Sequence, residues 1–422
     1  MRKMRDSGIA WIGVIPQDWE IVRTKSLYCS AKEIAGDRAD DFERLALTLN
    51  GVIKRSKEDS VGLQPEKFSG YQILKKGELV FKLIDLENVA TSRVGLSPYT
   101  GIVSPAYIVL SKQSRAKDLV VRYSMYHFLS MWQREIFNQM GDNGVRSSLN
   151  AKELLNIPHP FPSIYEQKRI VTFLDAQCAE IDAVLEKTHA SIEEYKKLKQ
   201  AVITQAVTKG IRGDRPMKDS GIEWIGDIPA EWDVIRVKQL LKERNERSKE
   251  GKEEPLSMSQ KVGLVPTKFL ESIPNMASSF VGAKLAYVDD LVFNKLKAHL
   301  GVFSVSRYDG LVSPDYAVYC STGKSNLKYL EYIFKTPQCI GEFRKKSTGI
   351  AAGLMRLYTE GLFSIYLPYP ALSEQEEIAE YLNEKCAGID ALIAKKQQYL
   401  TEIENYKKSL IYEYVTGKKE VV

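Results

Sequence analysis

Two long segments of this chain occur in duplicate, and this internal repeat constrains its fold more than any other feature. The segment from Asp6 to Trp19, DSGIAWIGVIPQDW, returns 213 residues later as DSGIEWIGDIPAEW, from Asp219 to Trp232. A second matched segment begins at Pro160 and returns 208 residues later at Pro368. Internal repeats of this kind mark repeated structural units, so we expect a pseudo-symmetric molecule with two halves.

The composition is that of a folded protein without a disulfide or zinc framework. Of the 422 residues, 44% are hydrophobic and 10% aromatic, which is enough to build two cores. Five cysteines (Cys29, Cys178, Cys320, Cys339 and Cys386) form no C-x-x-C pair. Cys178 and Cys386 stand at equivalent repeat positions, where we expect small buried helix residues.

No segment has the pattern of a membrane anchor or a signal peptide. The basic start, Met1 to Arg5, is not followed by an apolar stretch. The longest uncharged run, Val94 to Ser111, is broken by two prolines and two glycines. These observations predict a cytoplasmic protein.

Positive charge is concentrated in the two segments that lie between the repeats. Residues 51–150 hold 14 Lys and Arg against 9 Asp and Glu, and residues 255–365 hold 13 against 8. The repeated segment 163–210 is balanced, with 7 of each sign. This distribution suits two separate surfaces that face a polyanion, although excesses of this size also occur by ordinary surface scatter.

Each half ends in a predicted long helix. Ser163-x-x-Glu166 and Ser373-x-x-Glu376 have the form of capping boxes, and apolar residues then recur at spacings of three and four for about forty residues. Such a helix is roughly 60 Å long. We expect the two to pair antiparallel with each other through residues that include Ile181, Leu185, Ile192, Ile389, Ile393, Leu400 and Ile403.

The segments between the repeats predict mixed structure rich in strands. Short apolar runs at 78–81 and 290–293, and β-type runs at 106–110 and 316–319, have the composition of strands. Residues 119–139 and 327–343 look helical. Similar order in both halves indicates one fold present twice.

Motifs for catalysis are missing from the sequence. The four histidines, His127, His159, His189 and His299, are scattered, and none lies in H-E-x-x-H. No G-x-G, no G-x-x-x-x-G-K-[ST] loop and no pair of adjacent prolines occurs. We therefore expect no catalytic residue, no metal site and no cofactor.

Basic and polar residues instead recur at matched positions of the two variable segments. Arg and Lys can pair with guanine edges or phosphates, and Asn and Ser can contact base edges or the backbone. Each residue alone fits a solvated surface better than a DNA contact, so the recurrence carries the hypothesis. The candidate DNA-binding residues are Lys54, Arg55, Lys82, Arg93, Asn143, Arg146, Ser147, Lys295, Lys297, His299, Lys345, Lys346 and Arg356.

The sequence resembles the specificity subunits of type I restriction–modification systems. The resemblance rests on both copies of the D-S-G-I-x-W-I-G-x-I-P-x-x-W box and on the P-x-P-x-x-x-E-Q helix starts at Pro160 and Pro368. It rests also on the Ile-Asp-Ala triplets that begin at Ile181 and Ile389 and on Ala206-Val-Thr-Lys-Gly210. Within the variable segments the resemblance assigns no individual base contact.

The resemblance implies an α+β fold in which two globular mixed α/β target-recognition domains are separated by an antiparallel pair of long coiled-coil helices. The expected boundaries are 1–158 for the first recognition domain, 159–210 for the central helix, 211–365 for the second recognition domain and 366–422 for the C-terminal helix. Each domain would bind one half of a split, asymmetric site in double-stranded DNA. Two methyltransferase subunits would dock on the helices, and motor–nuclease subunits would complete the assembly.

Two other functions remain open from the sequence. A self-sufficient DNA methyltransferase or nuclease would need donor-binding or metal-binding motifs, which are not found. A coiled-coil scaffold without DNA recognition would need only the helices. DNA binding by the chain separates the scaffold from the specificity subunit.

Overall fold

The computed structural model describes residues 2–49, 51–59, 67–84, 86, 93–140, 148–260, 262–270, 280–349 and 355–421. Its contacts divide the chain into two compact units. Unit 1 comprises residues 1–188 and 398–422, and unit 2 comprises residues 189–397. Each unit therefore contains one globular part together with portions of both long helices, α4 (Ile164–Lys209) and α8 (Leu372–Val415).

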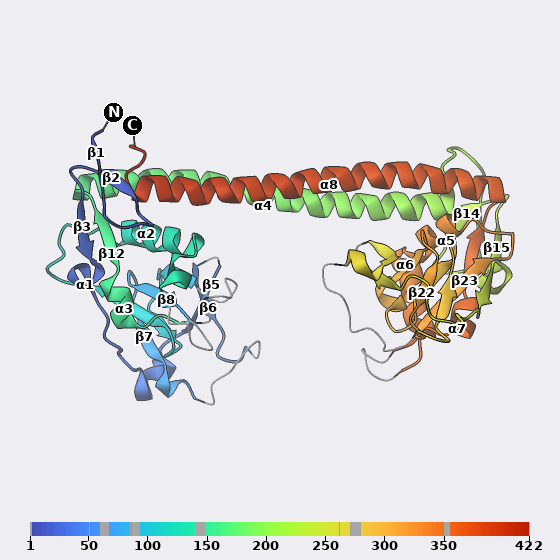
Figure 1. Cartoon of the computed structure of the whole chain (residues 1–422), viewed down its shortest axis with the longest axis horizontal. Coiled ribbons are helices and arrows are strands. Elements are labelled where there is room, and N and C mark those ends of the chain that lie inside the picture. Colours follow the sequence, from blue (N-terminus) through green and yellow to red (C-terminus); the bar gives the residue numbers. More distant parts are fainter. Residues whose placement is uncertain are drawn as a thin grey trace. The chain divides into compact units, whose positions relative to one another are not determined.

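The globular part of unit 1 consists of small sheets, antiparallel except for the parallel pair β5–β10, and short helices (Figure 1). Two four-stranded sheets, with orders β6-β5-β10-β7 and β4-β11-β8-β9, are accompanied by the pairs β1-β2 and β12-β3. The strands are β1 (Met4–Asp6), β2 (Val14–Pro16), β3 (Glu20–Arg23), β4 (Tyr28–Cys29), β5 (Arg44–Thr48), β6 (Gly51–Arg55), β7 (Gln72–Leu74), β8 (Leu79–Lys82), β9 (Arg93–Leu96), β10 (Gly101–Val103), β11 (Ile108–Lys112) and β12 (Pro158–Phe161). The helices of this part are α1 (Thr24–Leu27), α2 (Val121–Gln133) and α3 (Ala151–Asn156).

Unit 2 repeats this plan. The four-stranded sheet β16-β23-β20-β21 corresponds to β4-β11-β8-β9, and the pair β15-β24 corresponds to β3-β12. The strands are β13 (Met217–Asp219), β14 (Asp227–Pro229), β15 (Asp233–Arg236), β16 (Leu241–Arg244), β17 (Leu256–Ser259), β18 (Gly263–Pro266), β19 (Lys284–Ala286), β20 (Leu291–Asn294), β21 (Phe303–Val305), β22 (Gly310–Val312), β23 (Tyr316–Ser321) and β24 (Tyr366–Tyr369). The helices are α5 (Leu327–Phe334), α6 (Pro337–Lys346) and α7 (Thr359–Phe363). The predicted repetition of one mixed α/β fold is confirmed.

The long helices lie side by side and antiparallel within each unit (Figure 1). In unit 2 the Lys199 ammonium lies 2.6 Å from the Asp390 carboxylate, and in unit 1 Lys407 lies 2.5 Å from Asp182. These are the same two residue types at repeat-equivalent positions, with donor and acceptor exchanged between the helices. The two units therefore make equivalent contacts between the helices.

Apolar residues of the predicted stripe pack in the helix pair. Ile181, Ile192 and Leu400 are 9%, 4% and 7% exposed. Leu185 and Ile403 pack against the buried cluster of unit 1, while Ile389 and Ile393 are half-buried. Cys178 and Cys386 are buried among these residues, as expected for small helix residues, and burial raises the pKa of both thiols.

Two helix predictions were wrong in detail. Residues 327–343 form two helices, because Pro337 cannot continue α5 and instead starts α6, where the Thr336 hydroxyl accepts from the Cys339 amide. Ser373 does not cap α8, since this helix begins one residue earlier, at Leu372. At α4 the Ser163 hydroxyl does accept from the Glu166 amide, at 3.3 Å.

Candidate nucleic-acid interface

In unit 2, three segments that are distant in sequence meet just beyond the end of β20. The carbonyl of Lys295 accepts a hydrogen bond from the Leu357 amide at 3.0 Å. Thr348 and Arg356 exchange two backbone hydrogen bonds, of 3.0 and 2.8 Å. The candidate residues at 295–297, 345–346 and 356 are thereby brought to one place.

A turn fixes the backbone of this cluster. The Asn294 side-chain oxygen accepts from the amides of Leu296 and Lys297, at 3.1 and 3.3 Å, which is the geometry of an Asx turn. Lys297 follows this turn and is exposed. The turn therefore holds the Lys297 backbone in one conformation while its side chain stays free to reach a ligand.

The cations of this cluster differ in how strongly they are already paired. Lys345 forms an ion pair with Glu342 at 2.7 Å, and Arg356 lies 3.8 Å from Asp315. Among the described residues no side-chain partner is found for Lys297 or for Lys346, which is exposed in the last turn of α6. These two ammonium groups are the most available to a phosphate.

In unit 1 one backbone hydrogen bond of this arrangement recurs at the corresponding strand. The carbonyl of Leu83, just beyond β8, accepts from the Leu149 amide at 3.1 Å, as Lys295 does from Leu357. Lys82 ends β8 in register with Arg93 of β9. Asn143, Arg146 and Ser147 lie outside the described residues, as does the side chain of Arg93.

Three other candidates lie in different settings. Lys54 and Arg55 are on β6 and are paired with Glu43 at 2.5 Å and with Asp59 at 2.7 Å. His299 is only 7% exposed, and its Nδ1 has no hydrogen-bond partner among the described residues. A ring buried in this way is not on a DNA-facing surface, so we do not include His299 in the interface.

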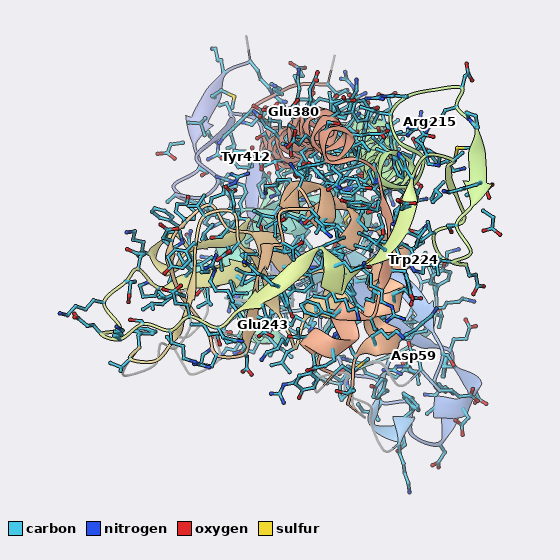
Figure 2. All side chains as sticks on the ribbon, turned by 90° about the vertical axis from the view of Figure 1, so that its right-hand side faces the viewer. Asp59, Arg215, Trp224, Glu243, Glu380 and Tyr412 are labelled. Carbon is cyan, nitrogen blue, oxygen red and sulfur yellow. The ribbon has the colours of Figure 1, made fainter. Side chains whose placement is uncertain are left out.

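Sequence reasoning missed the polar network that joins each globular part to the long helices. The Trp19 ring nitrogen donates to Glu166 of α4 at 2.9 Å, and the Trp232 ring nitrogen donates to Glu374 of α8 at the same distance. Arg2 bonds Glu166 and Asp18 in unit 1, and Arg215 bonds Glu374 and Glu231 in unit 2. Figure 2 shows Arg215 beside the end of α4, where it also donates to the Lys209 carbonyl.

Two further pairs of equivalent residues strengthen these junctions. Gln167 and Gln375 each donate to a proline carbonyl that precedes the helix, Pro162 and Pro370, and each accepts from a backbone amide at the start of α2 or α5. The Tyr123 hydroxyl donates to the carbonyls of Pro160 and Val415, and the Tyr329 hydroxyl donates to those of Pro368 and Val207. The sequence signal for most of them was identity at repeat offsets of 213, 208 or 206 residues, whereas Asp18 corresponds to Glu231.

We expect Glu374→Ala to destabilise unit 2 by about 3–5 kcal/mol, because it leaves the buried Arg215 guanidinium and the Trp232 N–H without this partner. Glu374 and Arg215 side chains are 7% and 11% exposed. The matched control is Glu377→Ala, which removes the exposed ion pair with Arg212 and should cost about 0–1 kcal/mol. Urea denaturation of both variants measures these changes in the free energy of unfolding. An equal loss of stability in the two variants would contradict a structural role for the network.

Comparison with known proteins shows which proteins share this architecture. No protein-family model matches the sequence. Among curated proteins, the specificity subunit of the type I restriction enzyme MjaVIII from Methanocaldococcus jannaschii is 24% identical, over 96% of this chain and 94% of its own length. The putative MjaX specificity subunit of the same organism is 25% identical, over 97% and 96%.

The chain is thus similar to type I specificity subunits along nearly its whole length. Solved structures agree on the fold. A chain from a structure of type I restriction–modification complex assembly and conformational transition aligns with a TM-score of 0.70 at 13% identity, over 96% of this chain and 99% of its own length. The specificity subunit from Thermoanaerobacter tengcongensis aligns with a TM-score of 0.50 at 14% identity, over 96% and 98%. The two-domain fold with two long helices is therefore shared with these two solved chains.

Neither a metal site nor a membrane span is found in the part of the chain that the structure describes. No group of three or more His, Cys, Asp or Glu side chains there could hold a metal ion. The helices described there include none that is both long and apolar enough to cross a bilayer.

Proposed function

We propose that this chain is the DNA-reading subunit of a type I restriction–modification complex, in which each unit binds one half of a split, asymmetric duplex site. The observation that carries the proposal is the matched pair of strand ends, at Lys82 and at Asn294–Lys297, where an equivalent backbone hydrogen bond follows the strand but the side chains differ. One scaffold present twice with different side chains suits the reading of two different sequences.

The charges near the unit 2 strand end support contact with a phosphate backbone. Arg344, Lys345 and Lys346 form the last turn of α6, and Lys295 and Lys297 lie across from it on the segment after β20. Lysine ammonium groups bind phosphates as point charges, and release of counterions makes such binding depend on salt. Base discrimination would come from side chains that reach a groove in addition to these contacts.

The long helices support the docking of two methyltransferase subunits. Several large apolar residues of the long helices are exposed, and two of them in each unit stand at repeat-equivalent positions: Val184 and Tyr406 in unit 1, Leu392 and Leu198 in unit 2. These four side chains are 39–53% exposed and occupy repeat-equivalent positions. Two equivalent apolar patches fit two copies of one partner. This partner, the methyltransferase subunit, would supply the adenine methylation. Motor–nuclease subunits would join the same assembly.

A gel-shift titration with duplex DNA, with and without a methyltransferase subunit, tests the proposal. A specificity subunit binds duplex DNA, and the added partner increases the discrimination among sequences. The second candidate, a coiled-coil scaffold that holds proteins together without reading DNA, predicts no shift in either titration. A shift that is equal for all sequences even with the partner would also contradict the proposal.

We expect Lys297→Ala and Lys346→Ala each to weaken duplex binding and to lower the slope of log K against log salt by about one, because each removes one phosphate contact. If Lys297 reads a base instead, the loss should be about 1–3 kcal/mol and restricted to one position of the half-site. Lys252→Ala is the control, since Lys252 is exposed and paired with Glu250 away from this strand end. Salt-dependent fluorescence anisotropy distinguishes these outcomes.

A further inference from the structure

The core of unit 1 contains four polar side chains at positions that are aliphatic in unit 2. The segment Val121–Phe128 (VRYSMYHF) of α2 matches Leu327–Phe334 (LKYLEYIF) of α5, and the Pro-His-Pro of β12 matches the Tyr-Leu-Pro of β24. Equivalent hydrogen bonds of Tyr123 and Tyr329 confirm the alignment. The polar cluster is Tyr28, Ser124, His127 and His159, and its counterparts are Leu241, Leu330, Ile333 and Leu367.

All eight residues are buried to the same degree. The four members of the polar cluster and their four counterparts are each at most 1% exposed. The strand register is also the same, since His159 pairs with Val22 of β3 and Leu367 pairs with Ile235 of β15. Each unit therefore provides the matched control for the other.

The two imidazole rings contact each other inside this core. Their centroids are 4.4 Å apart. The His159 Nδ1 lies 2.8 Å from the Pro160 carbonyl, and its Nε2 lies 2.9 Å from the Ser124 hydroxyl. The His127 Nε2 and the Tyr28 hydroxyl have no hydrogen-bond partner among the described residues.

This arrangement holds both rings in the neutral form. Nδ1 of His159 must donate to the carbonyl, so Nε2 accepts from Ser124. Protonation of that Nε2 would remove its acceptor role and leave a second N–H facing a hydroxyl. Protonation of His127 would place a buried N–H without an acceptor against the neighbouring ring, and two adjacent imidazolium ions would repel each other.

Few other titratable groups face the rings. The Tyr123 ring of α2 lies 5.7 Å from that of His159, and Tyr28 is contributed by β4. The Trp11 ring, which does not titrate, lies 5.7 Å from that of His127 at an interplanar angle of 35°. Glu20 and Arg23, at the ends of β3, are exposed. Glu166 lies close enough to Tyr123 to raise its pKa, but burial is the larger cause, and Glu374 has the same relation to Tyr329 in unit 2. The glutamates therefore affect the two units alike, whereas the histidines do not.

The direction of the pH dependence follows from burial. Burial lowers the pKa of His159 to about 4, and burial followed by the charge of His159 lowers the pKa of His127 well below its ordinary value of 6.5. The unfolded chain then binds protons more readily than the folded one. The stability that the neutral rings give is complete above pH 6.5 and is lost as the pH falls toward 4.

We propose that the polar cluster makes unit 1 acid-labile, so that its core opens under mildly acidic conditions while unit 2 stays closed. The two halves of one chain then differ in a property that their shared fold does not impose. A consequence for DNA, which rests on the proposed function, is that acid abolishes recognition of the first half-site before the second. The opening itself can be measured without DNA.

Hydrogen–deuterium exchange of the full chain at pH 7.5 and pH 5.0, corrected for intrinsic exchange rates, tests the proposal. We expect the opening equilibrium reported by α2 and β12 to rise by about 30-fold or more, which is the factor for His159 alone between these pH values. The equivalent elements α5 and β24 should change by less than about threefold. Equal changes in both units, or no change in unit 1, would overturn the proposal.

A variant shows whether the cluster causes the difference. Replacing the four residues by their unit 2 counterparts (Tyr28→Leu, Ser124→Leu, His127→Ile and His159→Leu) should abolish the excess exchange of α2 at pH 5.0. His159→Gln, which keeps a hydrogen-bonding side chain without a titratable ring, should reduce that excess by about 30-fold if it folds. If neither variant folds at pH 7.5, the comparison between the units of the unchanged chain still decides the matter.

These measurements distinguish failure of the acid-labile core from failure of the proposed function. Selective opening of unit 1 in a chain that never binds DNA would support the acid-labile core and contradict the DNA-reading role. Specific DNA binding in which both half-sites are equally sensitive to acid, without selective exchange in unit 1, would support the DNA-reading role and contradict the acid-labile core.

Discussion

Exchanging one globular part for that of a relative with another specificity should change one half of the methylated sequence and leave the other half as it was. The exchanged segment in unit 1 is 24–157, which keeps the N-terminal box, Trp19 and Glu166 in place. The matched exchange in unit 2 is 237–365, which keeps Trp232 and Glu374. The bonds of Trp19 to Glu166 and of Trp232 to Glu374 are then native in both chimaeras, so a change in sequence preference arises in the exchanged part.

The expected effect is large, because a single wrong base pair costs about 1–3 kcal/mol and a half-site contains several. Mapping of methylated adenines in plasmid DNA from cells that express each chimaera with the methyltransferase subunit measures it. A chimaera that keeps the whole original site, or one that loses both halves while remaining folded, would contradict the assignment of one half-site to each unit. Melting curves of both chimaeras supply the control for folding.

Methyl transfer should require a second protein. The purified chain is expected to transfer no methyl group and to cut no DNA, because its sequence lacks the donor-binding and nucleotide-binding motifs that these reactions use. Addition of the methyltransferase subunit should produce adenine methylation at one sequence only. The measurement is incorporation of labelled methyl groups into duplexes that carry or lack the site.

Variants of the exposed apolar pairs test whether the methyltransferase subunits bind to the long helices. Val184→Asp with Tyr406→Asp, or Leu392→Asp with Leu198→Asp, should each halve the number of methyltransferase subunits bound, since each pair would serve one subunit. Sedimentation of the complex measures the stoichiometry, and Tyr165→Asp, at a residue 78% exposed near the start of α4, is the control. Rigorously purified chain that methylates DNA alone would instead support a self-sufficient enzyme.

Much of the fold could be predicted because the repeats report it directly. Spacings of three and four define α4 and α8, and the repeated boxes around divergent segments define two units of one fold. Lys295, Lys297 and Lys346 were named as DNA-binding candidates because basic and polar residues recur at matched positions of the two variable segments; that they lie together in unit 2 was not predicted. These predictions used only residue spacing and internal repetition, both of which can be read from a linear sequence.

The remaining features depend on contacts over long separations. The Trp19–Glu166 bond joins residues 147 positions apart, and nothing local to either residue announces it. His127 and His159 looked unrelated in the sequence, yet packing of α2 on β12 brings their rings within 4.4 Å. His299 was grouped with exposed cations because it follows Lys297, whereas the turn after β20 directs it into the core.

The most direct measurement of the central claim is a genome-wide map of methylated adenines in a strain that carries the methyltransferase subunit with or without this chain. The account predicts one split, asymmetric motif that is fully methylated when the chain is present and unmethylated when it is absent. It predicts also that the motif has two specified parts separated by unspecified bases. The same motif without the chain, or methylation at no defined sequence with it, would contradict the claim that this chain reads the DNA.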